Sequence, residues 1–345
     1  MKKYLFYITQ NYSFAILRPL QERLRQQGDE VYWFFESDDV DPQYLRPAEK
    51  RWERVQQINK YRPDVVVATA NSIPDFLPGL KVCVFHGFDA GKRKPSGEKS
   101  HFRIRGCFDL YCTQGPNTTR VFRQKQQQLG YFNVIETGWP ALDPLFSSTP
   151  GRASEKPTIL FCSTFSRRLS AAPRLVDTID RISRRGNWHW LVQFHPKMPQ
   201  KTVDRYRQMQ HEHLEFIETD NIIPLLQQAD IMLSDTSSVI SMFLVQHKPV
   251  VTFRNIEPAP YLIDVTREEE IQPALETALT RPPELVDSIR EHVDLLHPYR
   301  DGRSSQRVIE AIEETLQGRH PVSARKPLNL IRNIKYRKRL GYWLP

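Results

Sequence analysis

Short runs of apolar residues alternate along the chain with segments whose apolar positions recur at helical spacing. Residues 4–8 form the first run, residues 14–27 carry an apolar face and end before a glycine, and residues 30–35 form the second run. This order predicts a strand, a helix and a second strand. The same pattern recurs in PDVVVATA, LKVCVFHG, FDLYCTQG and YFNVIETGWP. Such alternation is typical of a parallel sheet covered by helices.

A stretch rich in Ser, Thr, Pro and Gly, residues 147–157, interrupts this pattern. A second series follows in TILFCST, WHWLVQFHP, LEFIETD, ADIMLSD and KPVVTFR. Two halves of similar size predict an α/β protein with two Rossmann-like domains that face a cleft. We expect the first domain at residues 1–146, a linker at 147–157, the second domain at 158–318 and a tail at 319–345.

The positive charge of the chain is concentrated in that tail. The 345 residues include 49 basic and 40 acidic ones, which gives a formal net charge of +9. The tail holds eight of the basic residues and no Asp or Glu, so the rest of the chain is close to neutral. A near-neutral body without a second basic segment argues against a nucleic-acid partner.

Apolar and aromatic residues recur among the basic residues of the tail. They are Leu328, Leu330, Ile331, Ile334, Leu340, Tyr342 and Trp343. This mixture predicts an amphipathic element that lies on an anionic membrane surface, because interfacial segments combine both kinds of side chain. A disordered, solvated tail is the alternative interpretation of the same residues.

The cysteines and the N-terminus favour a cytoplasmic protein without a membrane span. The four cysteines show no paired CxxC spacing and lie mostly in apolar runs, which predicts buried, reduced thiols. Polar residues interrupt the first apolar stretch too early for a signal peptide, and no run approaches the length of a transmembrane helix.

Candidate site residues follow several of the predicted strands. His86 ends VCVFHG, His195 ends LVQFHP, and Asp235 ends IMLSD just before Ser237 and Ser238. Ligands of open α/β sheets bind beyond the carboxyl ends of the strands. Hydroxyls at the start of a helix favour an anion such as phosphate, although Ser is also common there as an ordinary helix cap. Neither GxGxxG nor GxxxxGK[ST] occurs, which excludes the common dinucleotide and P-loop motifs.

Several blocks, in this order, resemble the bacterial CDP-glycerol glycerophosphotransferases that build teichoic-acid-like polymers. The resemblance extends from about residue 82 to residue 312. The blocks are His86-Gly87 with Lys92, Thr137-Gly138-Trp139-Pro140 with Asp143, Ser163-Thr164-Phe165, His195-Pro196, LSDTSSV at residues 233–239, and Asp301-Gly302-Arg303 with Ser304 and Arg307.

The resemblance implies a GT-B fold and the transfer of a phosphoryl-linked alcohol from a CDP-linked donor to a hydroxyl of a lipid-linked or polymer acceptor. It implies no metal and no cofactor. His86 is then the expected base, and His195 is the second expected catalytic residue. The acceptor would be bound by Gly87 and Lys92. The donor would be bound by Thr164, His195, Asp235, Ser237, Ser238, Asp301 and Arg303, with Asp235 expected mainly to support its loop. We expect such an enzyme to be peripheral on the inner face of the cell membrane.

Departures from the family pattern leave the transferred group open. Met242 stands near the place of a family Asp, Thr236 replaces a Tyr, and Arg167 is displaced by one position. Ribitol phosphate or a sugar therefore remains an alternative to glycerol phosphate. A GT-B glycosyltransferase that uses a nucleotide sugar is the next candidate, followed by a UDP-sugar 2-epimerase, whose HxEAGxR element faintly resembles residues 86–93. A third alternative is a membrane-bound scaffold without catalytic activity.

Overall fold

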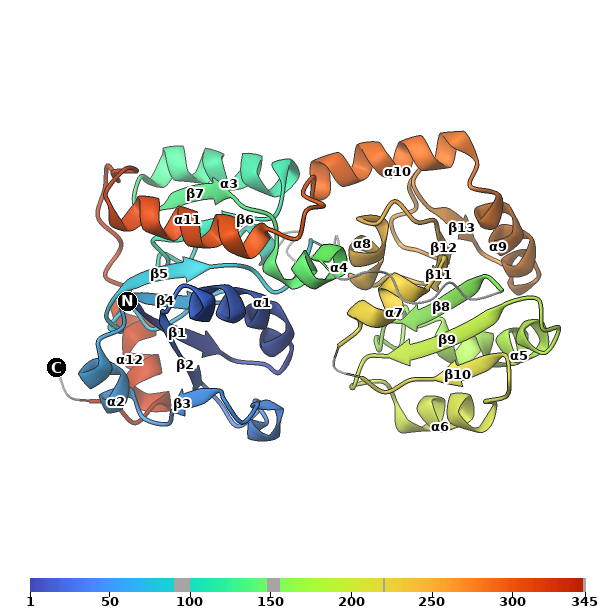
Figure 1. Ribbon diagram of the computed structural model, residues 1–345, viewed down its shortest axis with the longest axis horizontal. Helices are drawn as coiled ribbons and strands as arrows, with labels where there is room; N and C mark the ends of the chain where they lie inside the picture. The colour runs from blue at the N-terminus through green and yellow to red at the C-terminus, as the bar shows by residue number, and fades with distance from the viewer. Residues whose placement is uncertain (90–99, 148–155, 220, 344–345) are drawn as a thin grey trace. The chain divides into compact units, whose positions relative to one another are not determined.

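The computed structural model describes the chain except for residues 90–99, 148–155, 220 and 344–345 (Figure 1). The chain divides into two compact units. Unit 1 consists of Met1–Gly87, Arg93–Pro144 and Asp301–Pro345, and unit 2 consists of Phe88–Lys92 and Leu145–Arg300. Each unit is built on its own parallel sheet, as the alternating pattern predicted.

Unit 1 contains a seven-stranded parallel sheet with the strand order β3-β2-β1-β4-β5-β6-β7. Except for the edge strand β3, these strands are mainly apolar runs because helices cover both faces of the sheet. The strands are β1 (Lys3–Ile8), β2 (Glu30–Phe35), β3 (Lys50–Trp52), β4 (Val65–Ala68), β5 (Leu80–Cys83), β6 (Leu110–Thr113) and β7 (Asn133–Glu136).

Alternate side chains of β1 mark the two cores of unit 1. Leu5 and Tyr7 belong to a core that also holds side chains of α2 and α3, whereas Phe6 meets Trp33, which in turn contacts Phe14 of α1. This alternation follows from the two-residue period of a strand. The helices of the unit are α1 (Tyr12–Gln26), α2 (Val55–Tyr61), α3 (Pro116–Leu129), α11 (Ser304–Leu316) and α12 (Leu330–Arg339), and α4 (Asp143–Ser147) begins at its boundary.

Unit 2 contains a six-stranded parallel sheet with the order β10-β9-β8-β11-β12-β13. Its strands are β8 (Thr158–Ser163), β9 (His189–Phe194), β10 (Leu214–Phe216), β11 (Ile231–Ser234), β12 (Val250–Phe253) and β13 (Ile263–Val265). Its helices are α5 (Ala172–Ser183), α6 (Gln200–Gln208), α7 (Ile223–Gln228), α8 (Val239–Leu244), α9 (Ile271–Thr280) and α10 (Pro283–Leu296). A continuous core joins α5, α6 and α9 to one face of this sheet.

The chain returns to unit 1 earlier than the sequence suggested. We expected the second domain to extend to residue 318, but unit 1 already begins again at Asp301. The reason is α11, which buries Val308, Ile309 and Ile312 and contacts α1 and β6 of unit 1. Most of the predicted linker lies outside the described residues.

The four cysteines are buried and free, as predicted. Burial raises the pKa of the Cys83 thiol to about 12, which keeps it protonated at neutral pH. Within the described part of the chain, every helix is too short or too polar to cross a bilayer.

Candidate active site

Two neighbouring strands of unit 1 bring His86 and Thr69 together. Thr69 follows β4 and His86 follows β5, and these strands pair in parallel, so their carboxyl ends meet at one edge of the sheet. The Nδ1 atom of His86 lies 3.3 Å from the carbonyl oxygen of Thr69. A carbonyl can only accept, so Nδ1 must carry the proton in this bond. The Nε2 atom of the neutral ring then has a free lone pair and can accept a proton.

The surroundings of His86 keep this ring in its neutral form. Its side chain is exposed to solvent on one side, while the rings of Tyr12 and His101 lie 6.0 Å and 6.5 Å from it. Partial loss of hydration lowers the pKa of His86 below its usual value, and the nearby Arg105 guanidinium lowers it further. A neutral imidazole at physiological pH is the form that a general base needs.

The backbone that leads into His86 is unusual. Phe85 is buried and has a φ of 58°, a left-handed conformation that a bulky residue rarely adopts. The indole N–H of Trp139 donates to the carbonyl of Phe85 at 3.3 Å and thereby supports this turn. Strained backbone held by its surroundings is concentrated at functional sites. The Trp139 contact also joins two of the blocks singled out in the sequence.

The predicted acceptor residues are Gly87 and Lys92. Gly87 is half-buried, and an added Cβ there would meet no described atom within 4 Å. Lys92 lies outside the described residues.

Asp143 anchors the first turn of α11. Its two carboxylate oxygens accept the backbone N–H groups of Ser304 and Ser305, both at 2.7 Å. These are free N–H groups of a helix start, where a carboxylate is favoured. The contacts bring the Thr137–Asp143 block and the Asp301–Ser304 block together within unit 1.

Replacing Asp143 with Ala should destabilise the protein by about 1–2 kcal/mol, because two buried N–H groups lose a charged acceptor. Denaturation in urea should show a lower midpoint. The matched control is Asp287→Ala, which removes an exposed carboxylate paired with Arg290 and should leave the midpoint unchanged. Equal midpoints for the Asp143 variant and the unchanged protein would contradict this role.

Asp301 and Arg303 lie in unit 1, not in the unit that carries the other predicted donor-binding residues. Asp301 forms an ion pair with Arg307, which lowers the pKa of its carboxyl, and it also accepts the backbone N–H of Arg303 at 3.1 Å. These contacts indicate that Asp301 shapes the turn before α11. The Arg303 side chain is exposed, and its guanidinium carries no ion pair within the described part of the chain.

In unit 2 the remaining predicted residues, together with Asn255, which was not predicted, gather at the carboxyl ends of four adjacent strands. Thr164 follows β8, His195 follows β9, Asp235 follows β11, and Asn255 comes shortly after β12. Because these strands are neighbours in the sheet, their ends form one edge, as expected of a ligand site on an α/β sheet.

Asp235 organises this edge from the inside. It is fully buried, and its carboxylate accepts hydrogen bonds from Ser163 Oγ (2.5 Å) and from the backbone N–H groups of Thr164 (3.0 Å), Ala171 (2.9 Å) and Thr236 (2.6 Å). Burial raises the pKa of Asp235, while these four donors oppose the rise. A carboxylate occupied in this way favours the loop-supporting role over direct contact with a donor. Thr164 is likewise buried and contributes its backbone N–H to the loop.

His195, like His86, contacts the backbone through Nδ1, but in His195 this atom is the acceptor. The backbone N–H of Lys197 donates to His195 Nδ1 at 3.0 Å, so Nδ1 is an acceptor and the neutral ring carries its proton on Nε2. The side chain is exposed, and the Phe165 ring lies 4.6 Å from it. His195 thus presents an N–H donor, which suits a phosphate oxygen, whereas His86 presents a lone pair.

Ser237 and Ser238 precede α8. Ser238 is exposed and makes no side-chain capping bond, and Ser237 is half-buried and only weakly engaged, with Val239 N at 3.5 Å from its Oγ. The interpretation of these hydroxyls as ordinary helix caps therefore has little support. Their accessibility at the strand edge fits a role in binding a ligand.

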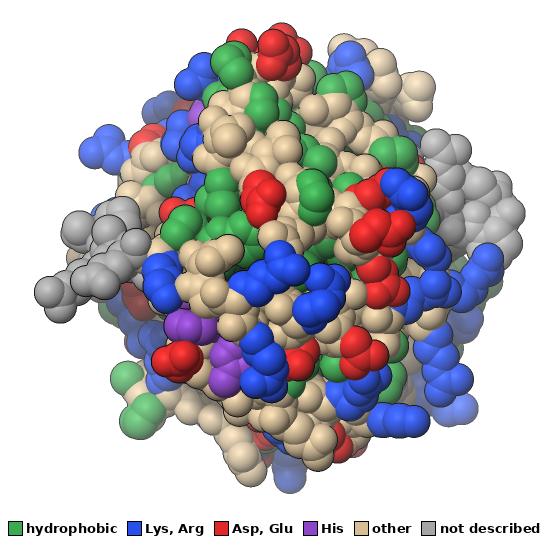
Figure 2. All heavy atoms as spheres, turned by 90° about the vertical axis from the view of Figure 1, so that its right-hand side faces the viewer, with side chains coloured by type: hydrophobic (Ala, Val, Ile, Leu, Met, Phe, Trp, Pro, Cys, Tyr) green, Lys and Arg blue, Asp and Glu red, His purple; other side chains and the backbone are tan. Residues whose placement is uncertain are grey.

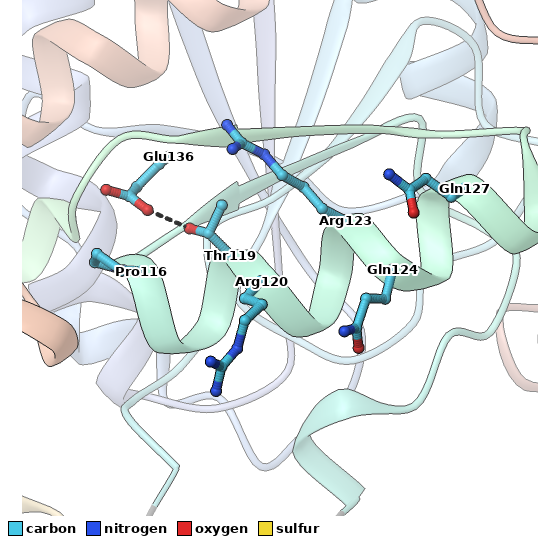
Figure 3. Close-up of a pocket in the computed structure, with 7 residues that line it drawn as sticks. All are labelled: Pro116, Thr119, Arg120, Arg123, Gln124, Gln127 and Glu136. Atoms are coloured by element: carbon cyan, nitrogen blue, oxygen red, sulfur yellow. Dashed lines mark hydrogen bonds between the residues drawn. The ribbon is translucent and has the colours of Figure 1, made fainter.

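A separate pocket lies along α3 and does not include any predicted site residue. It has a volume of about 330 Å³. Figure 3 shows Arg120 and Arg123 projecting from the helix, while Glu136 accepts a hydrogen bond from Thr119 at 2.6 Å. The arginines are exposed, so this pocket is an open groove. Over the face of unit 2 shown in Figure 2, basic, acidic and apolar side chains are intermingled.

Sequence reasoning missed Thr69 and Asn255, and it named Ser163 in a block without giving it a role; all three position predicted residues. The side chain of Asn255 donates to the Asp235 carbonyl at 2.7 Å. All three are polar residues at or just beyond a strand end, the same signal that singled out His86 and His195. Across the described residues, no group of His, Cys, Asp and Glu side chains could hold a metal ion.

Comparison with known families identifies the chain. Residues 86–261, half of the sequence, match the family described as CDP-glycerol:poly(glycerophosphate) glycerophosphotransferase. The chain belongs to this family. The matched region, called the family region below, begins at His86 and includes His195 and the loop of Asp235. Both histidines of this glycerophosphotransferase therefore lie inside it.

Solved structures agree with the GT-B fold of this glycerophosphotransferase. The wall teichoic acid polymerase TagF is 15% identical, with a TM-score of 0.65 over 92% of this chain and 90% of that one. A UDP-N-acetylglucosamine 2-epimerase from Listeria monocytogenes is 13% identical, with a TM-score of 0.66 over 92% of this chain and 97% of that one. S. aureus MnaA, in a structure with UDP, is 15% identical, with a TM-score of 0.66 over 92% and 97%. No match was found among curated proteins.

Proposed function

We propose that this enzyme transfers glycerol phosphate, or a related polyol phosphate, from a CDP-linked donor to a hydroxyl of a lipid-linked or polysaccharide acceptor in cell-surface polymer synthesis. The observation that carries the proposal is His86, a neutral imidazole with a free Nε2 at the end of β5, at the start of the family region. A crystal of TagF has been soaked with CDPG, which supports a CDP-linked donor by analogy.

In the proposed reaction, His86 Nε2 accepts the proton of the acceptor hydroxyl. The hydroxyl oxygen attacks the phosphorus atom that bears the glycerol. A new P–O bond forms there, and the bond from this phosphorus to the bridging oxygen of the diphosphate breaks. CMP leaves with the electron pair, and the proton passes from His86 to solvent. Negative charge is spread over the phosphate oxygens during this step, so N–H donors and cations nearby increase the rate.

In this proposal, the donor diphosphate is bound by side chains that can donate hydrogen bonds. His195 supplies Nε2–H, and the hydroxyls of Ser237 and Ser238 add donors without bulk. We keep Arg303 as a proposed phosphate ligand because its guanidinium carries no ion pair among the residues described. Asp235 is assigned to holding the loop before the two serines.

The acceptor determines where we expect the enzyme to work. A lipid-linked acceptor is held in a bilayer, so we place the protein on the inner face of the cell membrane as a peripheral enzyme. We propose no nucleic-acid partner. A nucleotide-sugar glycosyltransferase is the competing function, because the fold is shared with a UDP-N-acetylglucosamine 2-epimerase and with MnaA, whose structure contains UDP.

The donor class can be tested by titration calorimetry. We expect CDP-glycerol to bind at least about tenfold more tightly than UDP-N-acetylglucosamine, a difference of about 1.4 kcal/mol. CDP-ribitol in a parallel titration decides between the two polyols. Tighter binding of the UDP-sugar would refute the proposal and favour the glycosyltransferase or epimerase alternative.

A further inference from the structure

The tail of the chain is folded and docked on unit 1. Tyr336 of α12 and Tyr342 beyond it are buried, and their hydroxyls bond to Ser72 Oγ at 2.8 Å and Asn59 Nδ2 at 2.6 Å. Arg337 lies over the Phe76 ring at 4.6 Å. Figure 1 shows α12 next to α2, which carries Asn59. The expectation that Tyr342 faces a membrane is therefore wrong, because its ring belongs to the protein core.

Part of the positive charge of the tail is used inside unit 1. Arg332 pairs with Asp75 at 2.9 Å, and Arg339 pairs with Glu36 at 2.5 Å. A further pair joins Lys326 to Asp109 at 2.5 Å. These pairs fix the helix in one orientation. Residues 332, 333, 336, 337 and 340 recur at helical spacing and define its inner face, and Arg339 docks at the edge of that face.

The outer face of α12 exposes aliphatic side chains to solvent. Residues 331, 334, 335 and 338 follow each other at the spacing of one helix face, and all four are exposed. Ile331 and Ile334 are 74% and 56% exposed, and Leu328 and Leu330 at the start of the helix are 77% and 64% exposed. We call these four side chains the aliphatic ridge. Contiguous exposed aliphatic residues mark an interaction surface rather than an ordinary solvated helix.

Two unpaired cations border this ridge. Lys335 and Lys338 lie on the same helix face as Ile331 and Ile334, and neither carries an ion pair among the described residues. The segment from Arg319 to Trp343 contains no acidic residue. Aliphatic side chains flanked by lysines complement a surface that is apolar beneath and negatively charged at its rim. An anionic lipid bilayer has this chemistry.

We propose that the outer face of α12 binds anionic lipid, with the aliphatic ridge inserted between the headgroups and with Lys335 and Lys338 on the phosphates. The helix has ten residues and lies parallel to the bilayer surface, with its inner face still docked on unit 1. This inference does not depend on the proposed reaction, since lipid binding needs neither donor nor acceptor.

Flotation with vesicles of phosphatidylcholine alone, or mixed with phosphatidylglycerol, tests the proposal. The full chain should float with the mixed vesicles, and Ile331→Ser with Ile334→Ser should reduce the bound fraction by about tenfold. Lys335→Gln with Lys338→Gln should weaken binding mainly at low salt, because salt screens exposed charges. The control Leu295→Ser removes an aliphatic residue that is 58% exposed in unit 2 and should leave flotation unchanged.

Point substitutions suit this test better than removal of the tail, because a deletion would also take Tyr336 and Tyr342 out of the core. The exposed positions should tolerate Ser, so thermal melting and CDP-glycerol binding of the variants should match those of the unchanged protein. Equal flotation of the double isoleucine variant would overturn the proposal, as would equal binding of neutral and anionic vesicles. Light scattering gives a further test. If the full chain does not float but forms a dimer that the double isoleucine variant loses, the aliphatic ridge would be a self-association surface instead.

Discussion

His86→Asn should abolish transfer while donor binding survives. The Asn side chain can still donate to the Thr69 carbonyl from near the position of Nδ1, but it lacks the basic nitrogen at Nε2. Loss of a positioned general base lowers the rate by about 10²–10⁴-fold. Turnover measured as CMP release should fall by that factor, and the calorimetric affinity for CDP-glycerol should change little.

The pH profile gives a second readout for the same residue. The pKa of His86 is lowered, so the basic form is already dominant near neutral pH and is lost only as the pH falls through a value below 6.5. We therefore expect kcat/KM to be constant above about pH 7 and to decline in acid. The His86→Asn variant should lose this acid limb, whereas His320→Asn, at an exposed ion pair with Glu314, should retain it. Near-full turnover of His86→Asn would show that another group is the base.

The apolar runs predicted most of the fold for a physical reason. Strands of a parallel sheet are buried on both faces, so they appear as apolar runs, and eleven of the thirteen strands in the described chain coincide with predicted runs to within one residue. The two exceptions are the short edge strands β3 and β13, whose sequences KRW and IDV contain no such run. Both are three-residue strands with charged residues, too short and too polar to appear as an apolar run, whereas the edge strands β7 and β10 lie in predicted runs.

The return of the chain to unit 1 could not be predicted from local patterns. The apolar face of α11 shows that the helix is buried, but it does not show against which sheet. Long-range contacts decide this, above all the bonds from Ser304 and Ser305 to Asp143, residues more than 150 positions away. The same limit applied to the tail, where both Ile334 of α12 and Tyr342 beyond it were expected at the membrane, although Tyr342 is buried and Ile334 is exposed.

The candidate site was predictable in position but not in detail. Strand ends identified His86, His195 and Asp235, because the carboxyl ends of parallel strands share an edge. That rule does not predict the direction of each side chain. It could not show that Asp235 points into its loop, or that the two histidines bind the backbone through Nδ1 in opposite senses, one as donor and one as acceptor.

Asp235→Asn should destabilise the protein by about 3 kcal/mol or more, the other large effect expected here. The buried carboxylate accepts four hydrogen bonds, and an amide of the same shape would turn one oxygen into an NH₂ group that faces other donors. Hydrogen bonds to a charged group contribute about 1.5–3 kcal/mol each, and unsatisfied buried donors add a further cost. The urea midpoint should fall accordingly.

Two measurements on this variant separate support of the loop from contact with the donor. If the carboxylate supports the loop, stability and affinity for CDP-glycerol should fall together, because Ser237 and Ser238 follow directly after it. Asp177→Asn, at a carboxylate in unit 2 that is 90% exposed and paired with Arg205, should change neither quantity. An Asp235→Asn protein with an unchanged midpoint and lost donor affinity would instead place this side chain on the donor itself. That outcome would require the loop to open in the complex, because the oxygens of Asp235 are all occupied in the structure described above.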